Sequence, residues 1–355
     1  MTKQASFSEL EYAAKKKQTR RDRFLAEIEA VTPWAELERT ITPLYPSSGG
    51  RGRPPIELVR MLPMYVAQQC FGLSDEGVED ALYDSQAIRR FVGIDLAREA
   101  APDATTLLKF RRLMETHQLT ESIFNAINAN LAEKGLLLRE GTIVDTTLIA
   151  APPSTKNREG KRDEEMHQAK KGNQWHFGMT SRRRRTPAGW SREAGCGHEQ
   201  SEAAQMAHIG VDAQSGLVHT VIGTAANVSD VTQVQALLHG DETDAFGDAG
   251  YQGVEKRAEN LELPVTWHVA MRPGKRKAQP GTSLGDLLER IEHTKASIRA
   301  KVEHPLHVVK NLFRHRKTRY RGLAKNTAQL FSLFGFANLV LARRWLLNAN
   351  TQGAS

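Results

Sequence analysis

The sequence has few cysteines and no apolar leader, and both absences narrow what it can be. Only two of its 355 residues are cysteines, Cys70 and Cys196, and they lie far apart in different contexts. This excludes a disulfide framework and a paired-cysteine zinc site, and it suits a reducing cytosol. The first twelve residues, MTKQASFSELEY, contain no apolar run, so we expect no signal peptide.

Core-forming residues are missing from two long stretches. Leu, Ile, Val and Phe are absent from residues 152–174 and again from residues 180–208. A stretch of this composition cannot bury enough apolar surface to order itself, so we predict loops. Long apolar runs are scarce as well. The one at 328–347 contains Gln, Ser, Gly and Asn and ends among arginines, which favours a buried or partner-facing helix over a membrane span.

Positive charge is the main surplus. The chain carries a formal charge of +8 with a pI near 9.5, and 40% of its residues are hydrophobic. It is long enough for two domains, or for one domain with arms. A basic chain that also builds a core suggests an anionic partner, nucleic acid first, although a protein that is merely basic fits charge alone equally well.

The first 136 residues have the pattern of helices. Residues 6–40 are highly charged and helical in pattern, and the stretch YPSSGGRGRPP at 45–55 interrupts them. An all-α domain is predicted over 56–136, where Ser74 and Thr120 are the expected N-caps of two helices and Gly135 ends the last one.

From residue 141 the pattern changes to strands. GTIVDTTLIA (141–150) predicts a strand, and HIGVDAQSGLVHTVIGTAAN (208–227) predicts a hairpin. Ser229 or Asp230 is the expected cap of a helix that runs to Leu238. Short strands are predicted at 244–248 and 263–274 and a helix at 284–304, in sum a mixed sheet flanked by helices.

Three acidic residues are candidates for a site. Asp145 lies in the middle of a predicted strand, where an unpaired carboxylate is costly to bury. Asp248 ends a strand at a glycine turn, and sites in open α/β sheets gather at the carboxyl ends of strands. Glu303 shares one face of an ideal helix with Arg299 and Lys310.

Two readings of these acids stay open at this level. If they converge, they could hold two divalent cations of the Mg²⁺ type beside a phosphodiester. Otherwise Asp145 is hydrogen-bonded, Asp248 is a turn residue and Glu303 pairs with Arg299. Pro305 also complicates the helical face, because it should kink the helix near Lys301 and displace Lys310.

Several long strings resemble bacterial insertion-sequence transposases of the DDE class, in the insertion sequence 5 family. The resemblance covers the chain from about residue 40 onward. The strings that carry it are GRPPIELVRMLPMYVAQQCFGLSDEGVEDALYDS, PDATTLLKFRRL, VDTTLIAAPPSTKN, KKGNQWHFGM, AHIGVDAQSGLVHTVIGTAANVSDVTQ, FGDAGYQG and RAKVEHPLHVVKNLF.

The resemblance implies a fold, a reaction and a set of site residues. It implies a ribonuclease H-like α/β catalytic core after an all-α N-terminal domain, with Asp145, Asp248 and Glu303 as ligands of two Mg²⁺ or Mn²⁺ ions. It also places Arg299 and Lys310 in the family's signature around the glutamate. The signature's tyrosine is Ala296 in this chain, which puts any contact made by that tyrosine in doubt.

One segment departs from the resemblance. In relatives the string HFGM runs almost directly into AHIGVD, whereas about 27 residues intervene here, at 180–206. The segment is either a tolerated surface loop or non-native sequence written into a strand. Loop-closure entropy rises slowly with length, so folding can survive, but a break inside a strand would endanger its register.

Basic stretches supply the expected DNA contacts. Residues 154–171 and 310–325 are rich in Lys and Arg, and Arg51-Gly-Arg-Pro54 resembles the core of an AT-hook, or else is only a linker. A bare charged face remains the alternative for the basic stretches. The candidate contacts are Arg51, Arg53, Arg111, Arg112, Lys156, Arg158, Lys170, Lys171, Arg314, Arg316, Lys317, Arg319 and Arg321.

The combined prediction is a cytoplasmic, nucleoid-associated bacterial DNA transposase. It would act as a homodimer on double-stranded DNA, both terminal inverted repeats and target, with no membrane contact. The alternatives are a catalytically impaired DNA-binding relic and a metal-dependent nuclease without strand transfer. The predicted parts are a charged arm and linker (1–55), the all-α DNA-binding domain (56–136), the catalytic domain (137–309) with its disordered insert, and a basic segment with a C-terminal helix (310–355).

Overall fold

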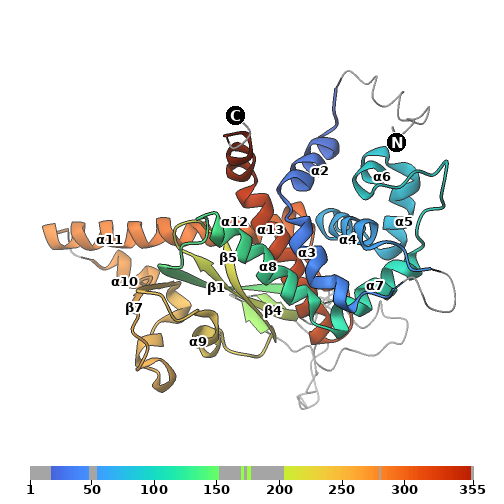
Figure 1. The fold of residues 1–355 in the computed structure, drawn as a ribbon. Helices are drawn as coiled ribbons and strands as arrows, with labels where there is room; N and C mark the ends of the chain where they lie inside the picture. The colour runs from blue at the N-terminus through green and yellow to red at the C-terminus, as the bar shows by residue number, and fades with distance from the viewer. Residues whose placement is uncertain are drawn as a thin grey trace, which may run out of the picture.

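The computed structural model describes residues 17–47, 54–151, 169–171, 174–176, 204–279 and 281–352. Within these ranges a group of N-terminal helices lies to one side of a five-stranded sheet, and a long C-terminal helix runs between the two (Figure 1). Four predicted DNA contacts, Arg51, Arg53, Lys156 and Arg158, fall outside these ranges, as does the predicted insert up to residue 203.

Seven helices form the N-terminal part of the described chain. Ser74 caps α5 as predicted, since its Oγ accepts a hydrogen bond from the Gly77 N–H at 2.9 Å. Thr120 does not cap α8: the chain turns from α7 within two residues, so α8 begins at Leu119 after Gln118, which has a left-handed φ of 52°. The helices are α2 (Arg20–Val31), α3 (Trp34–Ile41), α4 (Leu58–Phe71), α5 (Asp75–Asp84), α6 (Gln86–Val92), α7 (Ala104–Thr116) and α8 (Leu119–Glu133).

The sheet is mixed, with the order β5-β4-β1-β6-β7. Its central strand β1 pairs antiparallel with β4 and parallel with β6. The predicted hairpin is confirmed as β4 and β5. The strand β4 also includes residues 204–206, which we predicted to belong to the insert. The strands are β1 (Gly141–Ala150), β4 (Ala204–Asp212), β5 (Val218–Ala225), β6 (Asp244–Gly247) and β7 (Thr266–Val269); β2 (Ala169–Lys171) and β3 (Gln174–His176) form a separate ribbon.

Alternate residues of β1 face two different layers. Ile143 belongs to a large core cluster that includes the N-terminal helices, whereas Val144 packs with Val234 and Leu237 of α9 (Val234–Leu237) and with Tyr251. The connections that cover the second face are the short turns η3 (Asp230–Gln233), η4 (Ala249–Tyr251), η5 (Val254–Lys256) and η6 (Ala258–Asn260).

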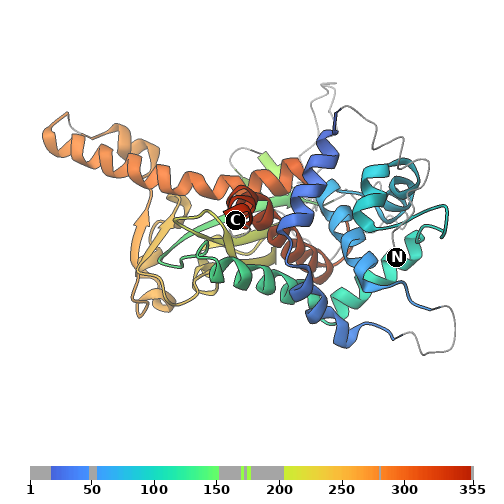
Figure 2. The ribbon, with the colours of Figure 1, turned by 45° about the horizontal axis from the view of Figure 1, so that its top comes forward.

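After β7 the chain forms a projecting helical arm. Figure 2 shows α11 (Ser283–Arg299), preceded by α10 (Pro273–Lys277), extending away from the sheet on the side opposite the N-terminal helices. The predicted break near Lys301 is confirmed, because the helix tightens to a 3-10 turn at Ala300–Val302. It resumes as α12 (Glu303–His307) and ends in a π-helical turn, η8 (Val308–Leu312).

The C-terminal helix α13 (Leu323–Gln352) is a core element and not a tail. By length and composition, residues 323–349 could cross a membrane, but 67% of the relevant window is buried inside the protein. The helix packs on α8, α2, α4 and β5, so the helical region and the sheet share one core cluster. The predicted C-terminal helix therefore packs in the same core as the sheet and the N-terminal helices.

A buried amide pair fastens α13 to the sheet. Asn338 Nδ2 donates to the Val218 carbonyl at 2.7 Å and to Asn128 Oδ1 at 2.8 Å, and Asn338 Oδ1 accepts from the Val218 N–H at 2.9 Å. Both amides are buried, so these bonds satisfy groups that would otherwise be costly. One contact thus joins α8, α13 and the start of edge strand β5.

Asp212 closes the β4–β5 hairpin onto the start of β1. Its carboxylate is 1% exposed and accepts four backbone N–H bonds, from Leu138, Arg139, Gln214 and Ser215, at 2.7 to 2.9 Å. Burial raises the pKa of this carboxyl, but the four hydrogen bonds outweigh burial and lower the pKa below its usual range. The charged form of Asp212 therefore stabilises the fold.

We expect Asp212→Asn to lower the free energy of unfolding by about 2–3 kcal/mol, because an amide cannot accept all four bonds. The loss should be largest at neutral pH and should shrink as the pH falls below about 3.9, where the carboxyl of the unfolded chain protonates. Urea unfolding measures it, with the exposed Asp84→Asn as control. Equal stability of the two variants would contradict this role.

Candidate active site

The strand register brings Asp145 and Asp248 together. Gly141, Thr142 and Ile143 of β1 pair in parallel with Asp244, Ala245 and Phe246 of β6. Two further steps of the same register set Asp145 opposite Asp248, which still has extended dihedral angles. Neighbouring strands lie about 4.8 Å apart, and residues opposite each other in register point to the same face. This continuation of the register would place the two carboxylates on one face of the sheet, where Asp248 Oδ1 also accepts a hydrogen bond from the Gly250 N–H at 2.7 Å.

The electrostatics of Tyr251 agree with this placement. Burial raises the pKa of the Tyr251 phenol, and the carboxylates of Asp230, Asp145 and Asp248 raise it further, against the hydrogen bond that Tyr251 shares with Thr146. A single phenol thus senses three negative charges.

Glu303 reaches the same face from α12. A cavity of roughly 330 Å³ lies between this helix and β1, and Thr147 is its β1 wall. Thr147 is two residues beyond Asp145 and so points to the same side of the sheet. The cavity is lined by Thr147, Glu303, Leu306, His307, Lys310, Asn311 and Arg316.

Arg299 and Lys310 take different positions relative to this cavity. Lys310 lines it together with Glu303 in spite of Pro305, whereas Arg299 is not among the lining residues. Arg299 ends α11, and its Nε is buried without a hydrogen-bond partner in the described structure. The 3-10 turn rotates the chain between Arg299 and Glu303, which an ideal helix does not represent.

A lysine anchors this irregular helix to the sheet. Lys301 Nζ donates to the backbone carbonyls of Ala213 and Gln214, at 2.7 and 3.0 Å, in the turn between β4 and β5. This contact holds the N-terminal end of α12, and with it Glu303, against the hairpin.

A layer of polar residues on the opposite face of β1 was not predicted from the sequence. His208 is fully buried, and its ring nitrogens share hydrogen bonds with Thr146 Oγ1 at 2.8 Å and Thr224 Oγ1 at 2.7 Å. Burial lowers the pKa of His208 to about 4, so the ring is neutral at neutral pH. Thr146 Oγ1 also shares a hydrogen bond with the Tyr251 hydroxyl at 3.0 Å. Thr146, the residue after Asp145, is therefore fixed by contacts on the face of β1 opposite to Asp145. A histidine inside a strand of apolar residues was the available signal.

The structure buries one of the predicted DNA contacts. Arg111 is 8% exposed; its guanidinium pairs with Asp75 and Glu115 and lies 4.4 Å over the Tyr320 ring. A guanidinium held by two carboxylates and an aromatic ring serves internal packing. We therefore leave Arg111 out of the DNA interface proposed below.

The other basic candidates vary in exposure. Arg319 is half-buried, donates to the Leu73 carbonyl at 2.9 Å and lines a cleft of roughly 590 Å³ with Arg111 and Tyr320. Lys170 and Lys171 lie on β2, where only the backbone is described. Side chains open to solvent belong to Arg112, Arg314, Arg316, Lys317 and Arg321.

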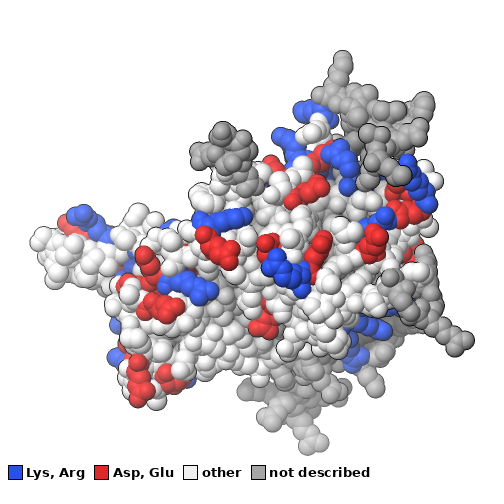
Figure 3. Space-filling view, in the orientation of Figure 1, with Lys and Arg blue, Asp and Glu red and all other residues white. Residues whose placement is uncertain are grey.

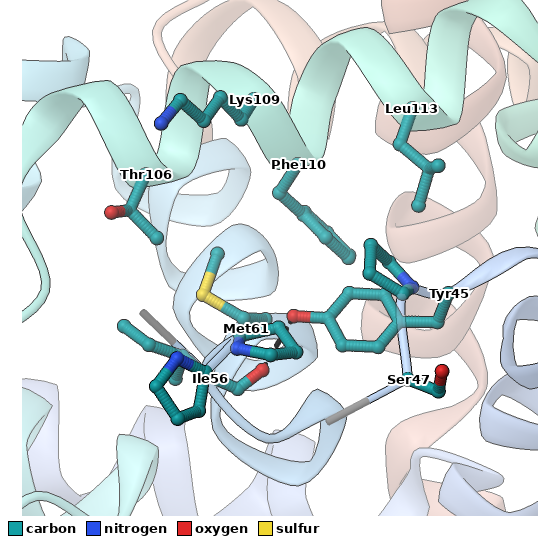
Figure 4. A pocket seen from close by; sticks show the side chains of 11 residues that line it. Tyr45, Ser47, Ile56, Met61, Thr106, Lys109, Phe110 and Leu113 are labelled. Atoms are coloured by element: carbon teal, nitrogen blue, oxygen red, sulfur yellow. Dashed lines mark hydrogen bonds between the residues drawn. The ribbon is translucent and has the colours of Figure 1, made fainter. Parts of the chain in front are cut away.

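A further cavity lies within the helical region. It measures roughly 420 Å³ and is walled mainly by apolar and proline side chains, with Thr106 and Lys109 on α7 (Figure 4). The Tyr45 hydroxyl donates to the Ile56 carbonyl at 2.5 Å across one side of it. Neither the acidic residues nor the exposed arginines line this cavity, so it is separate from the candidate active site.

A carboxylate in the central strand β1, a second one at the end of the neighbouring strand β6, and a glutamate beside a lysine and an arginine are typical of metal-dependent enzymes that act on phosphodiesters. Comparison with protein families agrees. A family model described as "Transposase DDE domain" matches residues 137–339, and one described as "Transposase domain (DUF772)" matches residues 12–113. The first match covers more than half of the chain, so this protein belongs to the DDE-domain transposases. No solved structure matches it.

Family membership confirms the broad prediction from sequence and leaves the finer one open. It supports a metal-dependent DNA-cleaving enzyme and implies a ribonuclease H-like core, with which the mixed sheet and its flanking helices are consistent. Assignment to the insertion sequence 5 family stays a prediction.

Acid should destabilise the protein partly through His208. Its folded pKa lies below the unfolded value of about 6.5, so the unfolded chain binds an extra proton as the pH falls from 6.5 towards 4. The free energy of unfolding should then fall by up to about 1.4 kcal/mol per pH unit from this residue alone. Urea unfolding between pH 7 and 4.5 should show a shallower slope for His208→Asn than for the exposed His293→Asn. Equal slopes would refute the assignment.

Proposed function

We propose that this protein is an insertion-sequence transposase of the insertion sequence 5 type that cuts the ends of its element and joins them to target DNA. The proposal is supported by the β1–β6 register, which if continued by two residues would set Asp145 opposite Asp248. It is also supported by the cavity that Glu303 lines, whose β1 wall is Thr147, two residues along the strand from Asp145.

Asp145, Asp248 and Glu303 would hold two Mg²⁺ or Mn²⁺ ions. The donor set fits, because all three side chains offer the carboxylate oxygens that hard divalent ions prefer. When bound, such ions supply activation of a water or a DNA 3′-hydroxyl and neutralise charge on the leaving oxygen.

The protein's own residues have distinct tasks around these carboxylates. Lys310 and Arg316 place positive charge in the cavity beside Glu303, where a phosphodiester would carry its negative charge. Thr146, His208 and Tyr251 hold the central strand from behind, which keeps the Asp145 backbone in one position. We assign Arg299 a positioning role near the start of α12, because it does not line the cavity.

A basic segment joined to the catalytic strand is the proposed path of the DNA backbone. The segment 316–318 is hydrogen-bonded to the last residue of β1: the Ala150 N–H donates to the Arg316 carbonyl at 3.3 Å, and the Thr318 N–H donates to the Ala150 carbonyl at 2.8 Å. Phosphate contacts here would sit close to the carboxylates. The proposed contacts are Arg314, Arg316, Lys317 and Arg321. Arg319 is a weaker candidate, because one of its guanidinium nitrogens donates to the Leu73 carbonyl.

Charge on the face shown in Figure 3 does not favour another path for DNA. Acidic and basic side chains alternate across this face, so it lacks the uniform positive field that binds phosphates. The basic segment, in contrast, has seven Lys or Arg residues and no acidic residue between 310 and 325.

The remaining parts of the proposal follow from the reaction. The N-terminal helices, which include Arg112, would bind the terminal inverted repeats, and two copies of the chain would hold the two ends as a homodimer. Mobile DNA in bacteria lies in the nucleoid, so we expect the protein in the cytoplasm, on DNA.

The two alternative functions make different demands on the structure. A catalytically impaired relic would need damage to the core, but β4 pairs with β1 without interruption from Ala204 to Asp212, a strand that includes the last three residues of the predicted insert. This supports an intact core. A nuclease without strand transfer needs the same carboxylates, so only the products of the reaction separate it from a transposase.

Replacing any one carboxylate by its amide should abolish end cleavage. We expect Asp145→Asn, Asp248→Asn and Glu303→Gln each to reduce nicking by at least about 10³-fold, because each would remove a ligand of the ions that carry the chemistry. The assay uses linear DNA that contains the sequences flanking the gene, with Mg²⁺ or Mn²⁺, and gel separation of nicked and joined products.

The matched control is Asp241→Asn, whose side chain is mostly exposed and which should retain activity. Wild-type activity in Asp145→Asn would reject the site. Nicking without joined products would favour the nuclease, and DNA binding without nicking by the wild type would favour the relic.

The basic segment should contribute to affinity without reading sequence. We expect Arg314→Gln to weaken binding of specific and unrelated DNA by a similar factor, and to reduce the slope of log K against log[salt] by about 0.9. Fluorescence anisotropy at several salt concentrations measures both effects. Arg257→Gln, in the loop between β6 and β7, is the control, and an unchanged slope for Arg314→Gln would remove this residue from the interface.

A further inference from the structure

Two histidines and a glutamate meet on the other side of the sheet from the proposed catalytic carboxylates. His219 lies on β5, and His239 and Glu242 lie on the loop between α9 and β6. One ligand atom from each lies within 4.8 Å of the others. Thr142 bonds both His219 and Glu242, and it is three residues before Asp145 on β1, so it points to the opposite face.

The distances within this group suit a small tetrahedral ion. His239 Nε2 lies 3.4 Å from Glu242 Oε1, and the two imidazole rings approach edge to face with centroids 4.9 Å apart. Ligand bonds of 2.0–2.1 Å in a tetrahedral zinc site separate the ligand atoms by about 3.3 Å. The His239–Glu242 pair already has this spacing.

The carboxylate of this group is preorganised, and among the described residues no Lys or Arg forms an ion pair with it. Glu242 is 2% exposed; its oxygens accept hydrogen bonds from the backbone N–H groups of His239 and Gly240, both at 2.7 Å, and from the Thr142 hydroxyl at 2.9 Å. A buried negative charge is stable only when a positive charge or several donors compensate it.

The histidines present nitrogens that a metal could use. His239 Nε2 is buried and has no hydrogen-bond partner among the residues that the structure describes. The ring nitrogens of His219 lie beside hydroxyl groups, Nε2 at 3.0 Å from Thr142 Oγ1 and Nδ1 at 2.9 Å from Thr220 Oγ1, and a hydroxyl can rotate to leave a nitrogen lone pair to a metal ion. Gly210 leaves the space for the His219 ring, because a Cβ at that position would come within 2.7 Å of it.

We propose that His219, His239 and Glu242 form a second metal site, for one Zn²⁺-type transition ion. Two nitrogens and one oxygen favour zinc, cobalt or nickel over Mg²⁺, which prefers oxygen ligands only. The ion would tie edge strand β5 to the loop that leads into β6. Asp248 follows β6, so the site would act as a structural brace behind the catalytic face, and the proposal does not depend on the catalytic assignment.

Cobalt binding tests the site directly, because Co²⁺ in a tetrahedral N,N,O environment absorbs visible light. Metal-free full-length protein is titrated with Co²⁺ and then with competitors. We expect one tetrahedral Co²⁺ per chain by its visible absorption, displacement of this ion by Zn²⁺, and no displacement by millimolar Mg²⁺, which would compete only at the carboxylates. His239→Ala removes Nε2, which has no hydrogen-bond partner in the described structure, and one long hydrogen bond of 3.3 Å from the Asp241 N–H to Nδ1. This variant should therefore fold and should bind Co²⁺ at least about ten-fold more weakly.

Matched variants separate this site from the proposed catalytic one. His293→Ala, an exposed histidine on α11, and Asp145→Asn should both keep the cobalt spectrum. Zn²⁺ should also raise the melting temperature of the wild type and of Asp145→Asn, and not that of His239→Ala or Glu242→Gln. Absence of a tetrahedral spectrum, or an unchanged spectrum in both His239→Ala and Glu242→Gln, would overturn the proposal. An inactive carboxylate set would leave this result untouched.

Discussion

The parallel pairing of β1 with β6 is the constraint on which the candidate active site depends. Three paired residues, from Gly141 with Asp244 to Ile143 with Phe246, set the register that carries Asp145 and Asp248 to adjacent positions. A slip of one residue would turn one carboxylate to the opposite face, because side chains alternate along a strand. The packing of Ile143 and Phe246 in the same core cluster opposes such a slip.

The third carboxylate depends on contacts between parts of the chain that are far apart in sequence. Glu303 begins α12, and Lys301 fastens this helix to the β4–β5 turn, which Asp212 in turn closes onto the start of β1. The basic segment continues from α12 to the end of β1, and α13 then joins the sheet to the N-terminal helices. The site is thus framed by elements from both halves of one shared core.

The two faces of the central strand differ in chemistry. The face with Asp145 offers carboxylate oxygens and cationic side chains beside a cavity, as phosphodiester chemistry with hard ions requires. The opposite face holds His208, which is buried, and His219, which is half-buried, and they are bonded to Thr146 and Thr142 respectively. Alternation along β1 therefore puts the two proposed metal sites on opposite faces of the sheet. They also differ in their donors, three carboxylates in one and two histidines with a glutamate in the other, so they would favour different ions.

The sequence by itself determined the local elements and the family: the β1 strand, the β4–β5 hairpin, the Ser74 cap, the break near Lys301 and the DDE-transposase strings. These follow from short-range patterns, in which neighbouring residues dictate the conformation. Only the tertiary structure decided that α13 lies in the core, that Arg111 is buried under Tyr320, and that His219 meets His239 and Glu242. Each of these contacts joins segments that are far apart in the sequence. Packing between distant segments does not produce a repeating pattern of residue types, so it cannot be predicted from periodicity.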